Sequence, residues 1–226
     1  MSEATHIEFR NAQPSRVANA SGTIDFGMLK MQGVRVRYGR NEEVFGEGEP
    51  ADYVYGVVSG TVRTMRFTSD GRRQILGFHM AGDVFGLDLG GPHSCSAEAV
   101  TACEIVLVRR SAVEKAARED VAAAGALLTF ASNQLHEAQE HAIVLGRKGA
   151  GERVAAFLLR FADRFSGRRE LDLPMSRADI ADYLALTIET VSRAFTQMER
   201  DHAIALPSSR RVVMCSRSAL EELQAA

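Results

Sequence analysis

The sequence of 226 residues has no tryptophan, only three cysteines and no long run of apolar residues. Cys95, Cys103 and Cys215 are odd in number and far apart, so a disulfide framework is not expected. Because no CxxC pair occurs, a zinc finger or thiolate cluster is not expected either. No segment resembles a signal peptide or a membrane-spanning helix. We therefore expect a cytoplasmic protein without a metal and without a membrane partner.

The excess of basic charge that is typical of nucleic-acid-binding proteins is also lacking, since the net charge is −2. The balance of basic and acidic residues differs along the chain. Residues 1–146 contain 14 Lys and Arg against 18 Asp and Glu, whereas residues 147–226 contain 13 against 11. The C-terminal third is the more basic part, and any contact with phosphate must depend on where individual side chains lie.

Residues 175–200 have the pattern of two short amphipathic helices that meet at a tight turn. Apolar residues recur at helical spacing with a break at residues 186–187. Ser176 followed by Asp179 predicts a capping box at the start of the first helix, and Thr187 is a suitable N-cap for the second. This pattern predicts a helix-turn-helix.

The second helix begins with residues that can read DNA bases. Glutamate accepts a hydrogen bond from cytosine, arginine bonds guanine, serine contacts several bases, and isoleucine packs on a thymine methyl. The residues predicted to contact bases are Ile188, Glu189, Ser192 and Arg193. The alternative is an ordinary helix pair in which Glu189 and Arg193 form a surface ion pair.

Short β-type runs with regular turn signals occupy the N-terminal half and predict an antiparallel barrel or jelly roll. The expected strands are residues 34–38, 43–45, 53–58, 61–67, 74–78 and 104–108. An enzyme of the cupin kind needs a close set of histidine and carboxylate ligands. His79 and His93 are far apart in the sequence and no H-x-H occurs, so an enzyme is not expected.

Residues 111–118 and 121–147 are expected to form a short and a long helix. Two sets of residues in the long helix repeat every seven positions, which is the a/d pattern of a coiled-coil seam. The residues predicted to form a homodimer interface are Leu128, Ala131, Leu135, Ala138, Ala142 and Leu145. The alternative is a helix that packs on its own barrel.

Beyond a hinge at residues 149–151, an amphipathic helix is expected over residues 152–165 and a short strand over 171–173. Strands at residues 203–206 and 211–215 would form a wing whose tip carries Arg210 and Arg211, unless these arginines are merely solvated. The fold class is α+β. The predicted divisions are a flexible arm (1–22), a β-roll (23–120), a dimerisation helix (121–147) and a winged helix-turn-helix domain (148–226).

A roll, a seam-forming helix and a winged helix-turn-helix in this order resemble the CRP/FNR superfamily of bacterial transcription regulators. Three segments carry the resemblance: GFHMAGDVFG at residues 77–86, the segment at residues 147–158, and the E-x-x-S-R box at residues 189–193. The sequence is most similar to the FixK branch. One departure is Ala185, since the family usually has glycine there. A strained alanine at this turn costs up to about 1 kcal/mol.

The resemblance implies a homodimeric activator that binds a palindrome of the TTGA…TCAA type in double-stranded DNA. Target genes of the branch serve microaerobic respiration, nitrogen fixation and denitrification. The residues expected at the DNA backbone are Ser176, Arg177, Thr187, Thr190, Arg210 and Arg211. The loop expected to touch RNA polymerase is formed by Ser69, Asp70, Gly71, Arg72 and Arg73.

The resemblance also bears on what the roll senses. Leu87 stands where cyclic-nucleotide-binding relatives have a glutamate, and Cys95 stands where they have an arginine. A phosphate would lack its charge-assisted partner, so we expect no cAMP binding. No cysteine precedes Cys95, which excludes the N-terminal cluster of iron–sulfur relatives. We expect activity without a cofactor or bound effector.

Two alternatives remain from the sequence. One is a ligand-gated regulator that senses haem or a nitrogen oxide through the roll, with His79, His93 or His6 as the ligand. The other is redox control through Cys215, which follows the wing. Ordinary burial is the expectation for this cysteine.

Overall fold

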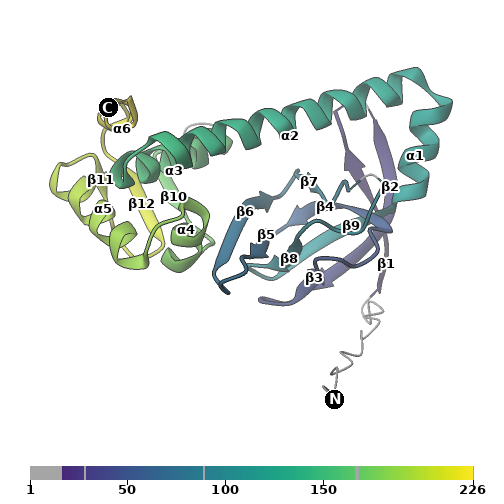
Figure 1. The fold of residues 1–226 in the computed structure, drawn as a ribbon, viewed down its shortest axis with the longest axis horizontal. Helices are drawn as coiled ribbons and strands as arrows, with labels where there is room; N and C mark the ends of the chain where they lie inside the picture. Colours follow the sequence, from purple (N-terminus) through teal and green to yellow (C-terminus); the bar gives the residue numbers. More distant parts are fainter. Residues whose placement is uncertain (1–16, 28, 89, 166–167, 226) are drawn as a thin grey trace, which may run out of the picture.

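The computed structural model describes residues 17–27, 29–88, 90–165 and 168–225. A roll of antiparallel strands comes first, a long helix crosses it, and a smaller domain of helices and a three-stranded sheet follows (Figure 1). The strands described in the roll are β1 (Val17–Asp25), β2 (Lys30–Tyr38), β3 (Glu43–Phe45), β4 (Tyr53–Ser59), β5 (Thr61–Phe67), β6 (Arg73–Met80), β7 (Val84–Phe85), β8 (Ser96–Ala99) and β9 (Cys103–Arg109).

The roll consists of two sheets, one with the order β1-β2-β9-β4-β7 and one with the order β3-β8-β5-β6. Every strand pair in both sheets is antiparallel. Apolar residues that alternate along the strands meet between the sheets and exclude water. The buried members of this core include Val36, Phe45, Tyr55, Val62, Phe85, Ile105 and Leu107. The predicted antiparallel roll is therefore confirmed.

The expected flexible arm is wrong at its C-terminal end. Residues 1–16 of that arm lie outside the described residues, but residues 17–22 belong to β1. Gly22 pairs with Gly33 of β2. A Cβ on Gly22 would lie 2.3 Å from Val106 Cγ2, and one on Gly33 would lie 2.2 Å from the Leu107 carbonyl oxygen. Because this close approach needs glycine, the segment lacks the alternating apolar pattern that predicts a strand.

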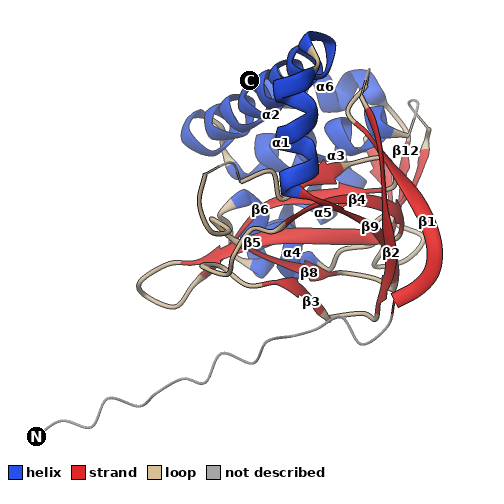
Figure 2. Cartoon of the chain, turned by 90° about the vertical axis from the view of Figure 1, so that its right-hand side faces the viewer, coloured by secondary structure: helices blue, strands red, loops and turns tan. Residues whose placement is uncertain are grey.

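Helix α1 (Arg110–Glu119) leads into the long helix α2 (Val121–Arg147), and both lie on one side of the roll (Figure 2). Asp120 caps α2 by accepting a hydrogen bond of 2.9 Å from the Ala122 N–H. In the first turns, Ala123 and Ala126 are buried, and the Phe130 ring meets Phe26 edge-on at 5.4 Å. Residues 131–140 are all exposed. The alternative of a helix packed along its own roll thus applies only to the first turns.

The C-terminal domain packs its helices around one apolar core. Its elements are α3 (Ala150–Arg164), β10 (Glu170–Asp172), α4 (Arg177–Leu184), α5 (Ile188–Arg200), β11 (Ile204–Ala205), β12 (Arg211–Met214) and α6 (Arg217–Ala225). Leu158, Ile180, Phe195 and Leu220 are among the side chains that are almost completely buried in it. Among the described residues, no helix combines the length and apolarity that crossing a membrane requires.

Candidate DNA-binding surface

The first helix of the helix-turn-helix begins at the predicted capping box. The Ser176 hydroxyl accepts a hydrogen bond of 3.1 Å from the Asp179 N–H. In return, Asp179 Oδ2 accepts one of 3.0 Å from the Ser176 N–H. Because two of the otherwise unpaired donors at the helix start are satisfied in this way, α4 begins at Arg177.

The turn between the two helices is built on Ala185. This residue has φ 51° and ψ 48°, which is the left-handed region. The Leu186 N–H then donates to the Ala181 carbonyl at 2.9 Å, which closes the end of α4. Ala185, which stands where the family usually has glycine, therefore adopts the backbone conformation that glycine adopts without strain. For alanine this conformation is strained.

Helix α5 begins at its predicted cap and has one buried and one exposed face. The Thr187 hydroxyl accepts a hydrogen bond of 3.2 Å from the Thr190 N–H. Val191, Phe195 and Met198 pack inward. The residues on the exposed face are Ile188, Glu189, Ser192 and Arg193, which are the four predicted to contact bases.

Glu189 and Arg193 lie one turn apart on this exposed face. The Glu189 backbone N–H, the Thr187 hydroxyl and then the charge of Arg193 hold the pKa of the Glu189 carboxyl below its usual range. Glu189 is therefore ionised at neutral pH, and it can accept hydrogen bonds from the amino group of a base. Arg193 is exposed and has no ion pair among the described residues.

The wing is present, although both strands are shorter than predicted. β11 and β12 pair antiparallel, and the tip between them carries Arg210 and Arg211. Arg210 is exposed, whereas Arg211 forms an ion pair with Glu170 of β10. Cys215, which follows β12, is exposed, so the expectation that it is buried is wrong. Its neighbours Val212 and Met214 take the inward positions of the strand.

Besides Arg211, two other residues predicted to contact the DNA backbone, Ser176 and Arg177, interact with side chains of their own domain. The Ser176 hydroxyl donates to Asp179 Oδ2 at 2.8 Å. The guanidinium carbon of Arg177 lies 3.2 Å from the centroid of the Phe195 ring. Burial lowers the pKa of the Arg177 guanidinium to about 10. Arg177 would therefore have to leave Phe195 in order to reach a phosphate. The hydroxyls of Thr187 and Thr190 lie 3.0 Å apart and bond each other, whereas the Arg210 side chain is exposed.

The five residues predicted to touch RNA polymerase do not share one environment. Ser69, Asp70, Gly71 and Arg72 are exposed at the tip of the β5–β6 hairpin. Hydrogen bonds from Thr68 and Arg72 lower the pKa of the Asp70 carboxyl to about 2. Arg73 instead points toward α4 and pairs with Asp182 at 2.7 Å. Arg73 is thus occupied inside the molecule, contrary to the prediction.

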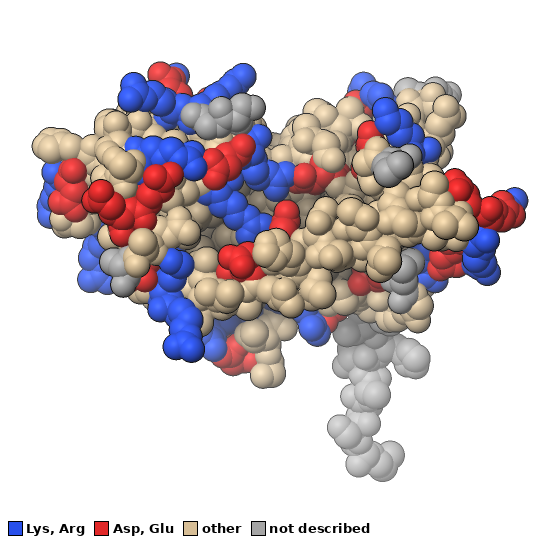
Figure 3. Space-filling view, turned by 90° about the horizontal axis from the view of Figure 1, so that it is seen from above, with Lys and Arg blue, Asp and Glu red and all other residues tan. Residues whose placement is uncertain are grey.

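Of the predicted dimer residues, Leu128, Ala131 and Leu135 lie on the free part of α2, whereas Ala138, Ala142 and Leu145 line a cleft between α2 and the rest of the chain. Leu128 is 73% exposed and Leu135 is 60% exposed, which is unusual for large apolar side chains. Ala131, Ala138 and Ala142 are exposed, and Leu145 is half-buried. Between residues 121 and 146, only Glu137 and Glu140 carry a full charge. Seen from the side of α2, a broad band of uncharged side chains lies to the right of the centre (Figure 3).

The interior of the roll does not suit a nucleotide phosphate. Burial, followed by the charges of Asp88 and Glu47, raises the pKa of the Cys95 thiol to about 11. His93 is buried, stacks on Phe45 and has its Nδ1 3.0 Å from Asp88 Oδ2. The neighbourhood of Cys95 is therefore acidic and filled with rings, whereas a bound phosphate needs donors and positive charge.

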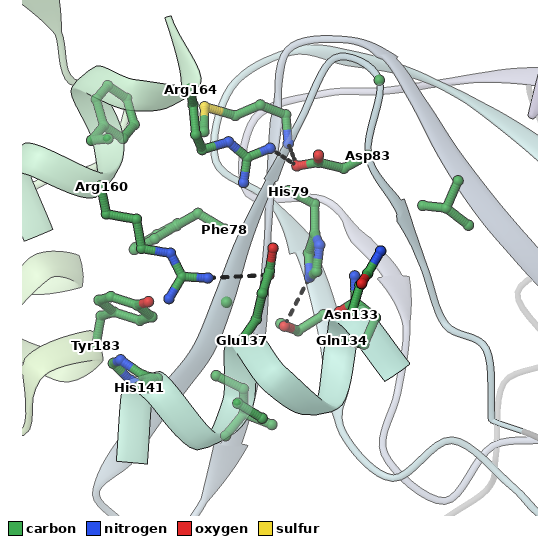
Figure 4. A pocket seen from close by; sticks show the side chains of 18 of the residues that line it. Phe78, His79, Asp83, Asn133, Gln134, Glu137, His141, Arg160, Arg164 and Tyr183 are labelled. Atoms are coloured by element: carbon green, nitrogen blue, oxygen red, sulfur yellow. Dashed lines mark hydrogen bonds and ion pairs between the residues drawn. The ribbon is translucent and has the colours of Figure 1, made fainter. Parts of the chain in front are cut away.

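A cleft of about 1100 Å³ lies between β6, α2, α3 and α4 (Figure 4). Two ion pairs line it, one joining Arg160 to Glu137 at 3.1 Å and one joining Arg164 to Asp83. His79 also lies on its wall, with Nε2 3.1 Å from the Thr64 hydroxyl. Burial lowers the pKa of His79 to about 4, so its imidazole is neutral at pH 7.

Both parts of the chain match known domain families. Residues 35–120 match the cyclic nucleotide-binding domain, and residues 152–223 match the Crp-like helix-turn-helix domain. The nitrogen fixation regulation protein FixK of Azorhizobium caulinodans is 45% identical over 218 residues, which cover 94% of this chain and 84% of that protein. FixK of Rhizobium meliloti is 41% identical over 199 residues, which cover 87% of this chain and 91% of that protein.

A solved structure shows the same fold. FixK2 from Bradyrhizobium japonicum matches with a TM-score of 0.83 and 46% identity, covering 86% of this chain and 98% of that one. Family models and relatives agree with the helix-turn-helix geometry described above. The chain belongs to the CRP/FNR family and is a FixK-like transcription regulator, not an enzyme, with a helix-turn-helix DNA-binding domain.

Proposed function

We propose that two copies of this chain pair through α2 and activate transcription from a TTGA…TCAA-type palindrome without a bound effector. The observation that carries the proposal is the combination of a free apolar face on α2 with a free polar face on α5. Two recognition helices presented by a symmetric dimer enter successive major grooves about 34 Å apart. A palindrome is the DNA that matches this symmetry.

Exposed leucines on the middle turns of α2 support pairing through this helix. Leu128 and Leu135 lie two turns apart on a helix whose neighbouring surface is alanine-rich. Burying such leucines against a second copy removes apolar surface from water, which stabilises association. Residues 131–140 of α2 are all exposed, although Glu137 reaches across the cleft to pair with Arg160 of α3.

Base reading is supported by the chemistry of the exposed face of α5. The ionised Glu189 is an acceptor for cytosine, and Arg193 is a donor for guanine. Ser192 and Ile188 complete a surface with hydrogen-bonding and apolar parts. Arg210 on the wing is free to contact the phosphate backbone and so to fix the orientation of the domain.

Activity without an effector is supported by the filled interior of the roll. Near Cys95, the guanidinium of Arg66 is already paired with Glu47, and the surroundings are otherwise acidic and aromatic. The target genes follow by analogy from the relatives, whose names refer to nitrogen fixation regulation. We propose that this chain regulates genes of the same class, together with genes for microaerobic respiration and denitrification. The chain would function in the cytoplasm and contact RNA polymerase through residues 69–72.

The test is fluorescence anisotropy of the protein on a labelled TTGA…TCAA duplex and on a scrambled duplex, without added ligand. We expect at least hundredfold tighter binding to the palindrome. Arg193→Ala should lose this preference, because each lost bidentate base contact costs about 1–3 kcal/mol per half-site. Arg200→Ala removes the same charge from the last turn of the same helix and should keep the preference. Equal affinity of the wild-type protein for both duplexes would reject the proposal.

A second candidate is a ligand-gated regulator of the same family that senses haem or a nitrogen oxide. The observation that favours it is the cleft beside His79, whose imidazole is neutral and so in the form that binds metals. Titration with haemin distinguishes the two candidates. A saturable complex with a shifted Soret band that His79→Ala abolishes would favour sensing, and unchanged DNA affinity after haemin addition would favour the effector-free regulator.

A further inference from the structure

The roll and the helix-turn-helix meet at a buried group of charges. Arg63 of β5 is only 8% exposed, and its NH1 donates to Asp179 Oδ1 of α4 at 3.1 Å. Its NH2 pairs with Glu98 of the neighbouring strand β8. A buried arginine from the middle of the roll therefore bonds one carboxylate in its own sheet and one in the DNA-binding domain.

A second arginine from the same hairpin reaches the same helix. Arg73 NH2 donates to Asp179 Oδ1 at 2.7 Å, and Arg73 Nε donates to Asp182 Oδ2 at 2.7 Å. Asp179 and Asp182 are three residues apart, so they lie on one face of α4. Two arginines and two aspartates thus join the β5–β6 hairpin to the first helix of the helix-turn-helix.

Asp179 connects this interface to the start of α4 itself. Its Oδ1 receives both arginines, while its Oδ2 receives the N–H and the hydroxyl of Ser176. Burial raises the pKa of Asp179, but the Ser176 hydrogen bonds and the charges of Arg63 and Arg73 outweigh it and leave the pKa below the usual range. Asp179 is consequently ionised at neutral pH and both arginines remain held.

Apolar and polar contacts surround the charged group. Met65 and Ile75 of the roll belong to the same buried core as the helices of the DNA-binding domain. The Phe78 ring lies 5.4 Å from the Tyr183 ring, and Gln74 Nε2 donates to the Tyr183 carbonyl at 3.3 Å. The hairpin therefore contacts α4 along much of its length.

The covalent joint between α2 and the DNA-binding domain is short and extended. Lys148 has φ −96° and ψ 143°, and Gly149 has φ −68° and ψ 168°. Small changes of these angles would swing α4 and α5 relative to α2. Since α5 follows α4 after a tight turn, whatever holds α4 against the roll also fixes the direction of α5.

We propose that Arg63 and Arg73 are positioning residues for DNA recognition, which act through Asp179 to fix the angle of α5 relative to α2. In the dimer this angle sets the distance between the two recognition helices and thereby the half-site spacing that the protein accepts. Buried ion pairs often contribute little net stability compared with apolar packing, yet they fix geometry because their partners are directional. The DNA part of this inference rests on the proposed function above.

The first experiment follows the domain angle without DNA. Cys215 is exposed, so it accepts a spin label, and Ser69→Cys adds a second exposed site on the hairpin. Labelled protein diluted with an excess of unlabelled protein gives the distance within one chain in any oligomeric state. We expect a single narrow distance distribution for the parent protein and a broadened or shifted one for Arg63→Met and Arg73→Met.

The matched control is Arg66→Met. Arg66 lies on the same strand as Arg63 and also forms an ion pair, with Glu47 at 2.7 Å, but both partners are largely exposed and belong to the roll. This variant should keep the narrow distribution. Because Arg63 is buried, Arg63→Met can prevent folding, and the less buried Arg73→Met then carries the same prediction. A folded Arg73→Met protein with the parent distribution would overturn the inference.

The second experiment uses palindromes whose half-sites are one base pair closer or farther apart than the best spacing, together with a single half-site. The parent protein and Arg66→Met should discriminate steeply between spacings. Arg73→Met should lose about tenfold affinity at the best spacing and discriminate less, while its half-site affinity stays unchanged. A parent protein that ignores the palindrome contradicts the proposed function alone. An unchanged spacing profile for Arg73→Met contradicts the positioning role.

Discussion

His93 lies flat against Phe45, with 3.6 Å between the ring centroids and 13° between the ring planes. The Tyr55 ring continues the group, since its centroid is 4.9 Å from that of Phe45. These rings fill the space between the two sheets of a roll that matches the cyclic nucleotide-binding domain. The fold of that domain is therefore retained with an interior that packs on itself.

We predict that cAMP does not bind this protein. A cyclic phosphate would have to displace packed rings and would then meet Asp88 and Glu47, while Arg66 is already paired with Glu47. Isothermal titration calorimetry should detect no heat of binding, and millimolar cAMP should leave the melting temperature unchanged. Micromolar affinity would contradict the prediction, and a cAMP-binding member of the family serves as the positive control.

Ala185→Gly should stabilise the protein. Ala185 adopts a left-handed conformation that costs an L residue about 1–2 kcal/mol, while glycine loses part of this gain through the greater entropy of its unfolded chain. We expect the free energy of unfolding to rise by about 0.5–1 kcal/mol in urea denaturation. Ala181→Gly, in the interior of α4, should lower it instead. A destabilised Ala185→Gly protein would show that the side chain has a packing role.

The three thiols should differ in reactivity. Burial raises the pKa of both Cys95 and Cys103 to about 11, so both thiols are protonated at pH 8; Cys103 is also buried and Cys95 is half-buried. Cys215 is exposed after the wing. We predict that Ellman's reagent labels one thiol per chain rapidly and the other two only after unfolding. Cys215→Ser should abolish the rapid phase, and two rapid equivalents in the native protein would contradict this account.

Local patterns in the sequence predicted those parts of the fold whose causes are local. The start of α5 follows from the predicted cap at Thr187, which accepts a hydrogen bond from the Thr190 N–H, and the structure adds a cap at Asp120 for the start of α2. The outward position of Cys215 was also readable from the alternation along β12, but the expectation of burial followed residue type instead. Residue type alone is a weak guide where a strand ends.

Contacts between residues far apart in the sequence could not be predicted in this way. Arg73 was assigned to an exposed loop, yet its partner Asp179 is 106 residues away. Arg177 was assigned to a phosphate, yet it packs on Phe195 in the next helix. The sequence did contain one indication of this interface, because the spacing of Asp179 and Asp182 places two acidic side chains on one face of α4. Such a pair on a DNA-binding domain indicates a basic partner other than DNA.

Leu135→Glu should separate the dimer without unfolding the chain. Leu135 is 60% exposed within one chain, so a carboxylate there remains solvated in a monomer. In a dimer paired through α2, two carboxylates would be buried against each other, which is strongly unfavourable. We expect sedimentation equilibrium at micromolar concentration to give a dimer for the wild-type protein and a monomer for Leu135→Glu.

The control for this prediction is His136→Glu. His136 is exposed and lies about 100° around the helix from Leu135, away from the predicted seam, since an α-helix has about 3.6 residues per turn. This variant adds the same charge and should remain dimeric. Circular dichroism should show unchanged helicity for both variants, because neither side chain is needed to form α2. A wild-type monomer, or a dimeric Leu135→Glu protein, would show that the two chains do not pair through this face, and the spacing of the recognition helices would then need another origin.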